Sequence, residues 1–192
     1  MTGAPAGSGH NGGPTLEPGA GWRRYAWRRA RAELLPTLPL EVVRLRVQRA
    51  RELGIDYKAY ASVRAATGRD VIALLFSVNA LRITPATPAM PPEEAARLAA
   101  VSGAERQLAV YRPLAPDRAL AVNAAALDLA APAPVLAEGW AATRERLAAF
   151  TRARGLPSDA VLVIGATTLE AEWVAAGRMA GYLPVERYFP AV

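Results

Sequence analysis

Two short apolar runs constrain the fold of this chain more than any other feature. Val71–Phe76 and Ala160–Ile164 are continuous but too short for typical buried helices, as expected for strands that are covered on both faces. The second run is followed at once by Gly165 and a helical pattern. Strands that alternate with helices indicate βαβ units and a mostly parallel sheet, so we expect an α/β fold.

The remaining patterns add a third strand and a series of helices. The strand is expected over Gln107–Tyr111. Apolar residues that recur every three or four positions predict helices over 22–35, 39–53, 57–67, 92–101, 117–129, 138–154 and 167–182. Asp56 is expected to cap the third of these, and Thr167 with Glu170 fits a capping box at the start of the last. Gly177 and Gly181, four residues apart, are expected to permit close contact between that helix and a neighbour.

The chain divides into a tail and one domain. Residues 1–21 are rich in Gly, Pro and Ala without periodicity, and we expect them to be disordered. Residues 22–192 are expected to form a single α/β domain, with a basic helical region over 22–68 packed on an α/β layer over 69–192. That layer should hold a small, mostly parallel sheet of about three or four strands flanked by helices.

Most side-chain chemistry that depends on Cys or His is excluded. The chain has no Cys, and its single His, His10, lies in the predicted tail. A disulfide framework, a thiolate metal site, a cysteine nucleophile and a Ser-His-Asp triad are therefore not expected. The acids are scattered without an Asp-x-Asp pair, and Glu93 with Glu94 is typical of a helix start. The sequence thus argues against an enzyme, and we expect no metal or cofactor.

The start of the chain carries no targeting pattern. No basic stretch followed by an apolar run occurs in its first twenty residues, and its longest apolar stretch is far shorter than the ~20 residues that a bilayer span needs. We therefore expect a cytoplasmic protein without a membrane partner.

Positive charge is concentrated in one third of the chain. From Trp22 to Arg69, eleven Arg and Lys58 stand against four acids, a net charge of +8, whereas the whole chain carries +6. This asymmetry favours a polyanionic partner such as DNA or RNA. The chain has 22 Arg and one Lys, a bias that codon usage in a GC-rich genome also produces, so a neutral origin of the Arg excess stays open.

Residues 50–63 resemble the helix-turn-helix unit of many DNA-binding regulators. The pattern consists of a small residue, a glycine four positions later and apolar residues around them, here Ala50, Leu53, Gly54, Ile55, Tyr60 and Val63. The resemblance implies that the second helix enters the major groove by its N-terminal end and places Tyr57, Lys58 and Ser62 near base edges. Phosphates would then be neutralised by Arg44, Arg46, Arg49, Arg51 and Arg64.

One position departs from this pattern. Arg49 directly precedes the small residue, where an apolar side chain is usual. Two short helices joined by a Gly turn also occur in many helical regions, so plain helix packing with a solvated Arg face explains the same residues.

A second candidate site lies at the turn between the last predicted strand and its helix. Gly165, Thr167 and Thr168 could contact a phosphate or carboxylate, because ligands of doubly wound folds sit at the carboxyl ends of strands. Asn79, after the first strand, would belong to the same rim. The turn has neither GxGxxG nor GxxxxGK[ST], and capping alone explains its residues. A similar strand-then-helix ending occurs in haloacid-dehalogenase-like phosphatases, but their Asp-x-Asp nucleophile motif is missing, so that family is not assigned.

Three functions follow from these patterns. The first is a non-enzymatic nucleic-acid-binding or regulatory protein that uses an Arg-rich helical surface. The alternative is an α/β protein or enzyme that binds a small phosphate- or carboxylate-bearing molecule at the Gly165 turn. An accessory factor that binds another protein through its helices is the third, and the sequence assigns no oligomeric state.

Overall fold

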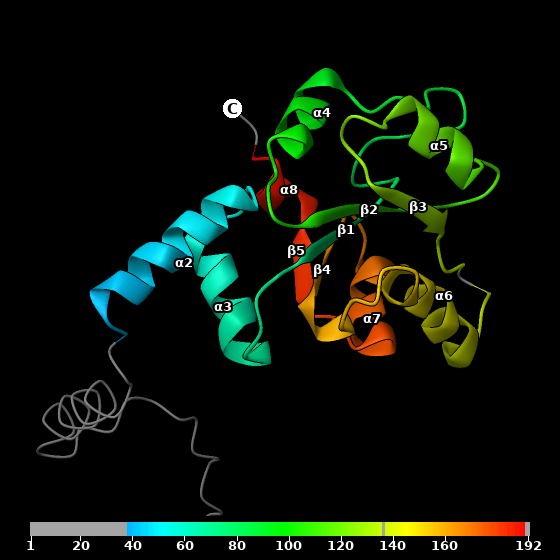
Figure 1. Cartoon of the computed structure of the whole chain (residues 1–192). Coiled ribbons are helices and arrows are strands. Elements are labelled where there is room, and N and C mark those ends of the chain that lie inside the picture. Colours follow the sequence, from blue (N-terminus) through cyan, green and yellow to red (C-terminus); the bar gives the residue numbers. More distant parts are fainter. Residues whose placement is uncertain (1–37, 136, 191–192) are drawn as a thin grey trace, which may run out of the picture. The chain divides into compact units, whose positions relative to one another are not determined.

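The structure, a computed structural model, describes residues 38–135 and 137–190 (Figure 1). Contacts between Cα atoms group Glu41–Val192 into one compact unit, distinct from Met1–Leu40. The predicted tail over 1–21 and the predicted helix over 22–35 lie outside the described residues. Within the described ranges, none of the helices has the length and apolar character that crossing a membrane requires.

A single sheet of five parallel strands lies at the centre of this unit, which confirms the α/β class. Its strands are β1 (Ala73–Ser77), β2 (Glu105–Val110), β3 (Leu129–Pro132), β4 (Val161–Gly165) and β5 (Gly181–Pro184), in the spatial order β3-β2-β1-β4-β5. In the register, Ala73 lies opposite Glu105 on one side and Val161 on the other. The chain builds outward from β1 first to β3, then returns to add β4 and β5. The strand order therefore reverses between β1 and β4, where doubly wound folds bind their ligands.

Helices cover both faces of the sheet, which explains the two continuous apolar runs. The helices that follow β1 are α4 (Pro92–Ala99), α5 (Pro116–Val122), α6 (Trp140–Arg152), α7 (Thr168–Gly177) and α8 (Val185–Tyr188). Leu74 and Phe76 of β1 pack in one hydrophobic cluster with residues of α4, α5 and α8, whereas Ala73 and Leu75 pack in a second with residues of α6 and α7 (Figure 1). Every residue of β1 and β4 is consequently buried.

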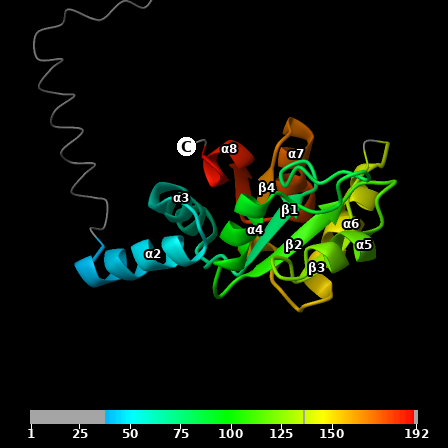
Figure 2. The ribbon, with the colours of Figure 1, turned by 90° about the horizontal axis from the view of Figure 1, so that it is seen from above.

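Two further helices, α2 (Leu40–Glu52) and α3 (Tyr57–Thr67), lie beside the sheet (Figures 1 and 2). Both agree with the predicted segments. Asp56 caps α3 by accepting a hydrogen bond from the Ala59 amide at 2.8 Å, and Gly68 ends it with a φ of 70°. Ala50 and Leu53 join the first hydrophobic cluster and anchor α2 to the rest of the unit.

Two of the predicted helices are too long. The helix expected over 117–129 ends at Val122, and the chain goes on to form β3. The helix expected over 167–182 ends at Gly177, because Arg178 adopts a left-handed conformation with a φ of 54°. Gly181 then belongs to β5, so the predicted Gly177–Gly181 helix face is wrong. Gly177 alone gives the expected close contact, because a Cβ atom there would lie 3.1 Å from the Leu147 Cδ1 of α6.

Candidate functional site

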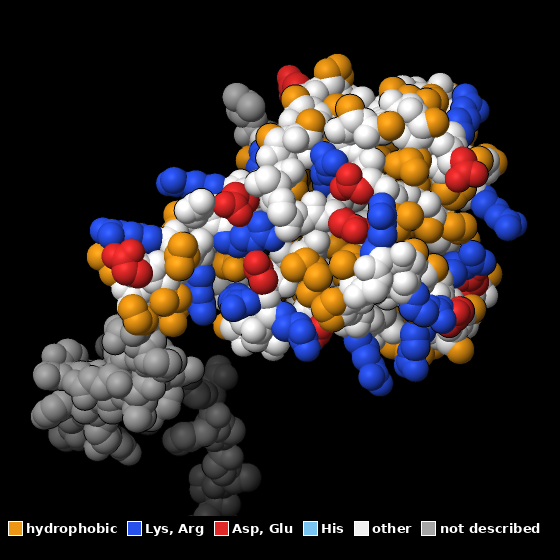
Figure 3. Space-filling view, viewed as in Figure 1, with side chains coloured by type: hydrophobic (Ala, Val, Ile, Leu, Met, Phe, Trp, Pro, Cys, Tyr) orange, Lys and Arg blue, Asp and Glu red, His pale blue; other side chains and the backbone are white. Residues whose placement is uncertain are grey.

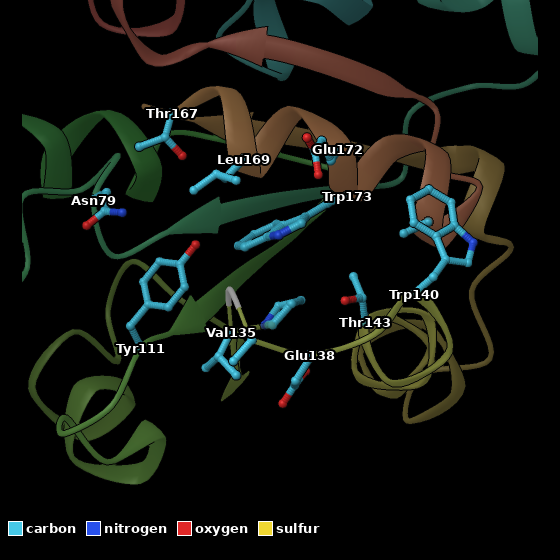
Figure 4. A pocket seen from close by; sticks show the side chains of 13 residues that line it. Asn79, Tyr111, Val135, Glu138, Trp140, Thr143, Thr167, Leu169, Glu172 and Trp173 are labelled. Carbon is cyan, nitrogen blue, oxygen red and sulfur yellow. The ribbon is translucent and has the colours of Figure 1, made fainter.

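The clearest candidate site is a pocket of about 680 Å³ at the carboxyl end of the sheet (Figure 4). Its walls are α6, α7, residues 134–135 and 137–138 before α6, Tyr111 after β2 and Asn79 after β1. We refer to it as the carboxyl-edge pocket. It lies beside the β1–β4 reversal of strand order, the position at which α/β sheets most often bind ligands.

The tight turn after β1 holds Asn79 at the rim of this pocket. The Ala80 amide donates to the Ser77 hydroxyl at 3.0 Å, and the Ile83 amide donates to the Val78 carbonyl at 2.9 Å. Both hydrogen bonds form a tight turn directly after β1. Asn79 is left exposed while Ser77 and Val78 are buried, so the amide group projects from the carboxyl edge.

Glu170 joins the ends of β1, β2 and β4. Its Oε1 accepts from the Asn79 Nδ2 at 3.0 Å and from the Tyr111 hydroxyl at 3.4 Å. Its Oε2 accepts from the backbone amides of Ala166 and Thr167 at 2.7 and 3.1 Å, as part of the capping box that the sequence predicts. The side chain is completely buried, and its four bonds make it a structural group.

The Tyr111 phenol acts as a hydrogen-bond donor at this edge. Burial and the neighbouring Glu170 carboxylate raise the pKa of Tyr111 well above its usual range. The phenol therefore stays protonated at neutral pH and donates to Glu170. Its ring packs against Trp173 with a centroid distance of 6.2 Å, so the pair forms part of the pocket wall.

Large apolar side chains are exposed around this pocket. Val135 is 38% exposed, Trp140 52% and Leu169 43%, and all three line it. Trp140 is thus exposed, although its spacing to Leu147 and Phe150 would place it on the same helix face as these two fully buried residues. Exposed apolar groups that gather at a concave surface are typical of a binding site.

Two of the four predicted ligand-binding residues reach this pocket. Asn79 and Thr167 line it. They follow β1 and β4, which are far apart in the sequence but neighbours in the sheet. Thr168 is exposed but does not line it, and Gly165 is buried beneath Glu170 and Tyr182. A Cβ atom on Gly165 would come within 2.8 Å of the Glu170 Oε2, so this glycine is required for packing.

The anion site predicted at the start of α7 is largely occupied from within the chain. The amides of Ala166 and Thr167, which would bind a phosphate or carboxylate, already donate to Glu170. The Glu170 carboxylate also places a negative charge at this helix terminus. The turn therefore favours an anionic ligand less than the sequence implies.

The predicted nucleic-acid residues lie on α2 and α3, and one of them has an internal role. Arg49 donates to Asp70 and Glu52 at 3.0 Å and to the carbonyls of Val71, Ser102 and Gly103 at 2.8–3.1 Å. Its side chain is 16% exposed. These contacts join α2 to the segments that enter β1 and β2, which explains the departure of this position from the helix-turn-helix pattern.

The remaining predicted contacts differ in exposure. Arg44, Arg51, Lys58 and Ser62 are exposed, whereas Arg46, Tyr57 and Arg64 are partly buried. Arg44 pairs with Glu41 on the surface of α2 at 2.9 Å. The six positions of the helix-turn-helix resemblance are all buried or partly buried, unlike the exposed Arg44, Arg51, Lys58 and Ser62. Gly54 adopts a φ of 70° at the turn. That burial is common to DNA-reading units and to ordinary helix pairs.

A smaller pocket of about 430 Å³ lies on the other side of Asn79. Three of its five charged side chains already interact within the protein: Arg82 pairs with the buried Glu94, and Arg97 stacks on Tyr188 and Phe189. The mixed charges of this lining favour neither an anion nor a cation.

Several residues of the carboxyl-edge pocket carry no signal in the sequence. Tyr111, Glu172 and the pair Glu138 and Thr143 come from three separate parts of the chain, and only the sheet and helix packing bring these parts together. Across residues 38–135 and 137–190, no three His, Cys, Asp or Glu side chains cluster in a way that could hold a metal ion. In comparisons with protein-family models, curated proteins and solved structures, nothing matched the chain.

Proposed function

We propose that this protein binds a small organic molecule in the carboxyl-edge pocket and acts as a binding module. The observation that carries this proposal is the set of three exposed apolar side chains, Val135, Trp140 and Leu169, around a pocket at the β1–β4 reversal. Pockets of a few hundred cubic ångströms with apolar walls and a few polar groups are the usual sites for small ligands.

Glu170, the completely buried carboxylate at this edge, has a structural and not a catalytic role. Asn79 and Tyr111 direct their donors at Glu170, whose carboxylate has four hydrogen bonds and is fully buried. A general base needs a carboxylate that reaches a substrate proton. Asn79, Thr143 and Thr167 are left to orient a ligand by hydrogen bonds.

The test is an NMR titration of the 15N-labelled chain with three probes that share one skeleton. These are 2-phenylethylammonium, 2-phenylethanol and 3-phenylpropionate, at millimolar concentrations. At least one should shift the indole N–H signals of Trp140 and Trp173, because both residues line the pocket.

A matched pair of variants shows where the probe binds. Thr143→Phe adds a ring to a lining residue of α6 and should abolish the shifts, whereas Ala142→Phe adds the same ring at an exposed position that does not line the pocket. If none of the three probes moves these signals, or if Thr143→Phe binds like Ala142→Phe, the proposed binding function is wrong.

A second candidate, nucleic-acid binding, is supported by the exposed cations on α2 and α3. Arg44, Arg51 and Lys58 are exposed on these neighbouring helices. On the face seen in Figure 3, however, acidic and hydrophobic side chains lie between the described cations of this region. The candidate predicts binding to random-sequence duplex DNA that weakens steeply between about 50 and about 200 mM salt.

Fluorescence anisotropy with labelled DNA tests this candidate. The test variant replaces four Arg by Gln together: Arg44, Arg46, Arg51 and Arg64. It should bind DNA more weakly and lose affinity less steeply with salt, since each phosphate contact contributes to the salt dependence. Arg49 is left in place because of its internal contacts. Arg118→Gln with Arg144→Gln, at exposed positions elsewhere, serves as the control. Equal loss in both variants, or no binding at the lower salt, rejects the candidate.

A further inference from the structure

We infer that the ligand of the carboxyl-edge pocket is an organic cation, an ammonium group attached to an aromatic or branched apolar body. This inference rests on the proposed binding function and adds the chemical class of the ligand. Its basis is the charge and the aromatic character of the pocket lining.

The charged side chains that line this pocket are all acidic. They are Glu138 from the segment before α6 and Glu172 from α7, and the described lining includes no Lys or Arg. The chain as a whole carries a net charge of +6, so this local acidity runs against the overall charge. A pocket with this lining attracts a cation and repels an anion.

Glu138 has an unsatisfied oxygen. Arg146 donates to its Oε1 only, and the Oε2 is buried without a hydrogen-bond partner among the described residues. A carboxylate oxygen that is removed from water and lacks a donor raises the free energy of the folded state. Water-sized groups do not reach this oxygen, so Glu138 acts on a cation in the pocket through its charge, and the ion pair with Arg146 would stay intact.

The start of α7 does not offset this acidity. A helix N-terminus normally attracts anions, but here the Glu170 carboxylate takes the amides of Ala166 and Thr167. A phosphate or carboxylate that entered the pocket would therefore meet Glu172 and the Arg146-paired Glu138, and no Arg or Lys of the described lining would bind it.

Aromatic rings provide the second element of recognition. Figure 4 shows Trp173 near the middle of the pocket, with Tyr111 on one side and Trp140 on the other. The face of a Trp or Tyr ring attracts a cation electrostatically, and the ring area also binds an apolar body. Acidic and aromatic groups together select an organic ammonium over an inorganic cation, which would gain nothing from the rings' apolar area.

The order of affinities of the three probes tests this inference. The ammonium should bind about 10-fold more tightly than the alcohol, and the carboxylate most weakly, because the phenylethyl part is constant and the terminal group changes from positive to neutral to negative. Added salt should reduce the preference for the ammonium. A nonspecific effect of the net charge of +6 would give the opposite order.

Two double variants separate the local effect from net charge. Glu138→Gln with Glu172→Gln should remove most of the preference for the ammonium and leave the affinity for the alcohol within about twofold. Glu41→Gln with Glu145→Gln removes the same formal charge at exposed positions outside the pocket and should leave the preference unchanged.

The outcomes distinguish this inference from the proposed function. If the alcohol or the carboxylate shifts Trp140 and Trp173 at least as tightly as the ammonium, the pocket binds ligands and the cation inference is wrong. An equal effect of both double variants also overturns it. If no probe shifts these signals in the folded chain, the binding function fails and the inference fails with it.

Discussion

Arg49 illustrates how the surroundings of a residue decide its role. The sequence predicts a phosphate contact, because Arg44, Arg46 and Arg51 surround it on one helix. The structure gives it two carboxylates and three backbone carbonyls of its own chain. A guanidinium has five N–H donors in a fixed plane, and here they join three segments. A pattern of charges along one helix contains no information on these distant partners.

Replacement of Arg49 should therefore affect stability more than replacement of a neighbouring Arg. We expect Arg49→Gln to lower the free energy of unfolding by about 2–3 kcal/mol, since it leaves Asp70 and the carbonyls of Val71 and Gly103 without this donor. Arg44→Gln breaks only an exposed pair with Glu41 and should cost less than about 0.5 kcal/mol. Urea unfolding followed by tryptophan fluorescence measures both. Equal small changes would show that Arg49 is not a structural group.

At the scale of elements, α7 is fixed at its start by Glu170 and at its end by Arg178. The sequence predicts the start correctly, because Thr167 and Glu170 have the spacing of a capping box. It does not predict the end, since Arg is not a residue type that favours a positive φ. Local chemistry determines the first boundary, and the chain's return to the sheet as β5 determines the second.

The missed strands have a physical explanation as well. Leu129–Pro132 and Gly181–Pro184 form the two edges of the sheet, are four residues long and each end in Pro. An edge strand tolerates a residue without an N–H, whereas a pattern search treats it as a break. The central strands are recognisable in the sequence because they are buried on both faces.

The capping of α7 predicts a measurable effect on stability. Glu170→Gln should reduce the free energy of unfolding by about 2–3 kcal/mol, because an amide can no longer accept from Asn79, Tyr111 and two backbone amides together. Thr167→Ala, which removes only the other half of the capping box, should cost about 1 kcal/mol. Urea denaturation of the two variants gives the comparison. A Glu170→Gln variant as stable as the unmodified chain would contradict the structural role of this carboxylate.

At the scale of the whole unit, the two candidate surfaces lie at different parts of the sheet. Arg49 attaches α2 near the segments that enter β1 and β2, whereas the carboxyl-edge pocket lies where these strands end. The sequence predicts Asn79 and Thr167 for this pocket through the general rule for α/β sheets. It does not predict Tyr111, Glu138 or Trp140, because only the strand order brings them to one place.

An NMR titration with 2-phenylethylammonium decides whether the carboxyl-edge pocket binds a ligand. The Trp140 and Trp173 indole N–H signals should shift in the unmodified chain and in Ala142→Phe, and should stay in place in Thr143→Phe. 2-Phenylethanol should bind more weakly, and 3-phenylpropionate should bind most weakly. Signals that stay in place with every probe, or that move equally in both Phe variants, would contradict the claim that this pocket binds a ligand.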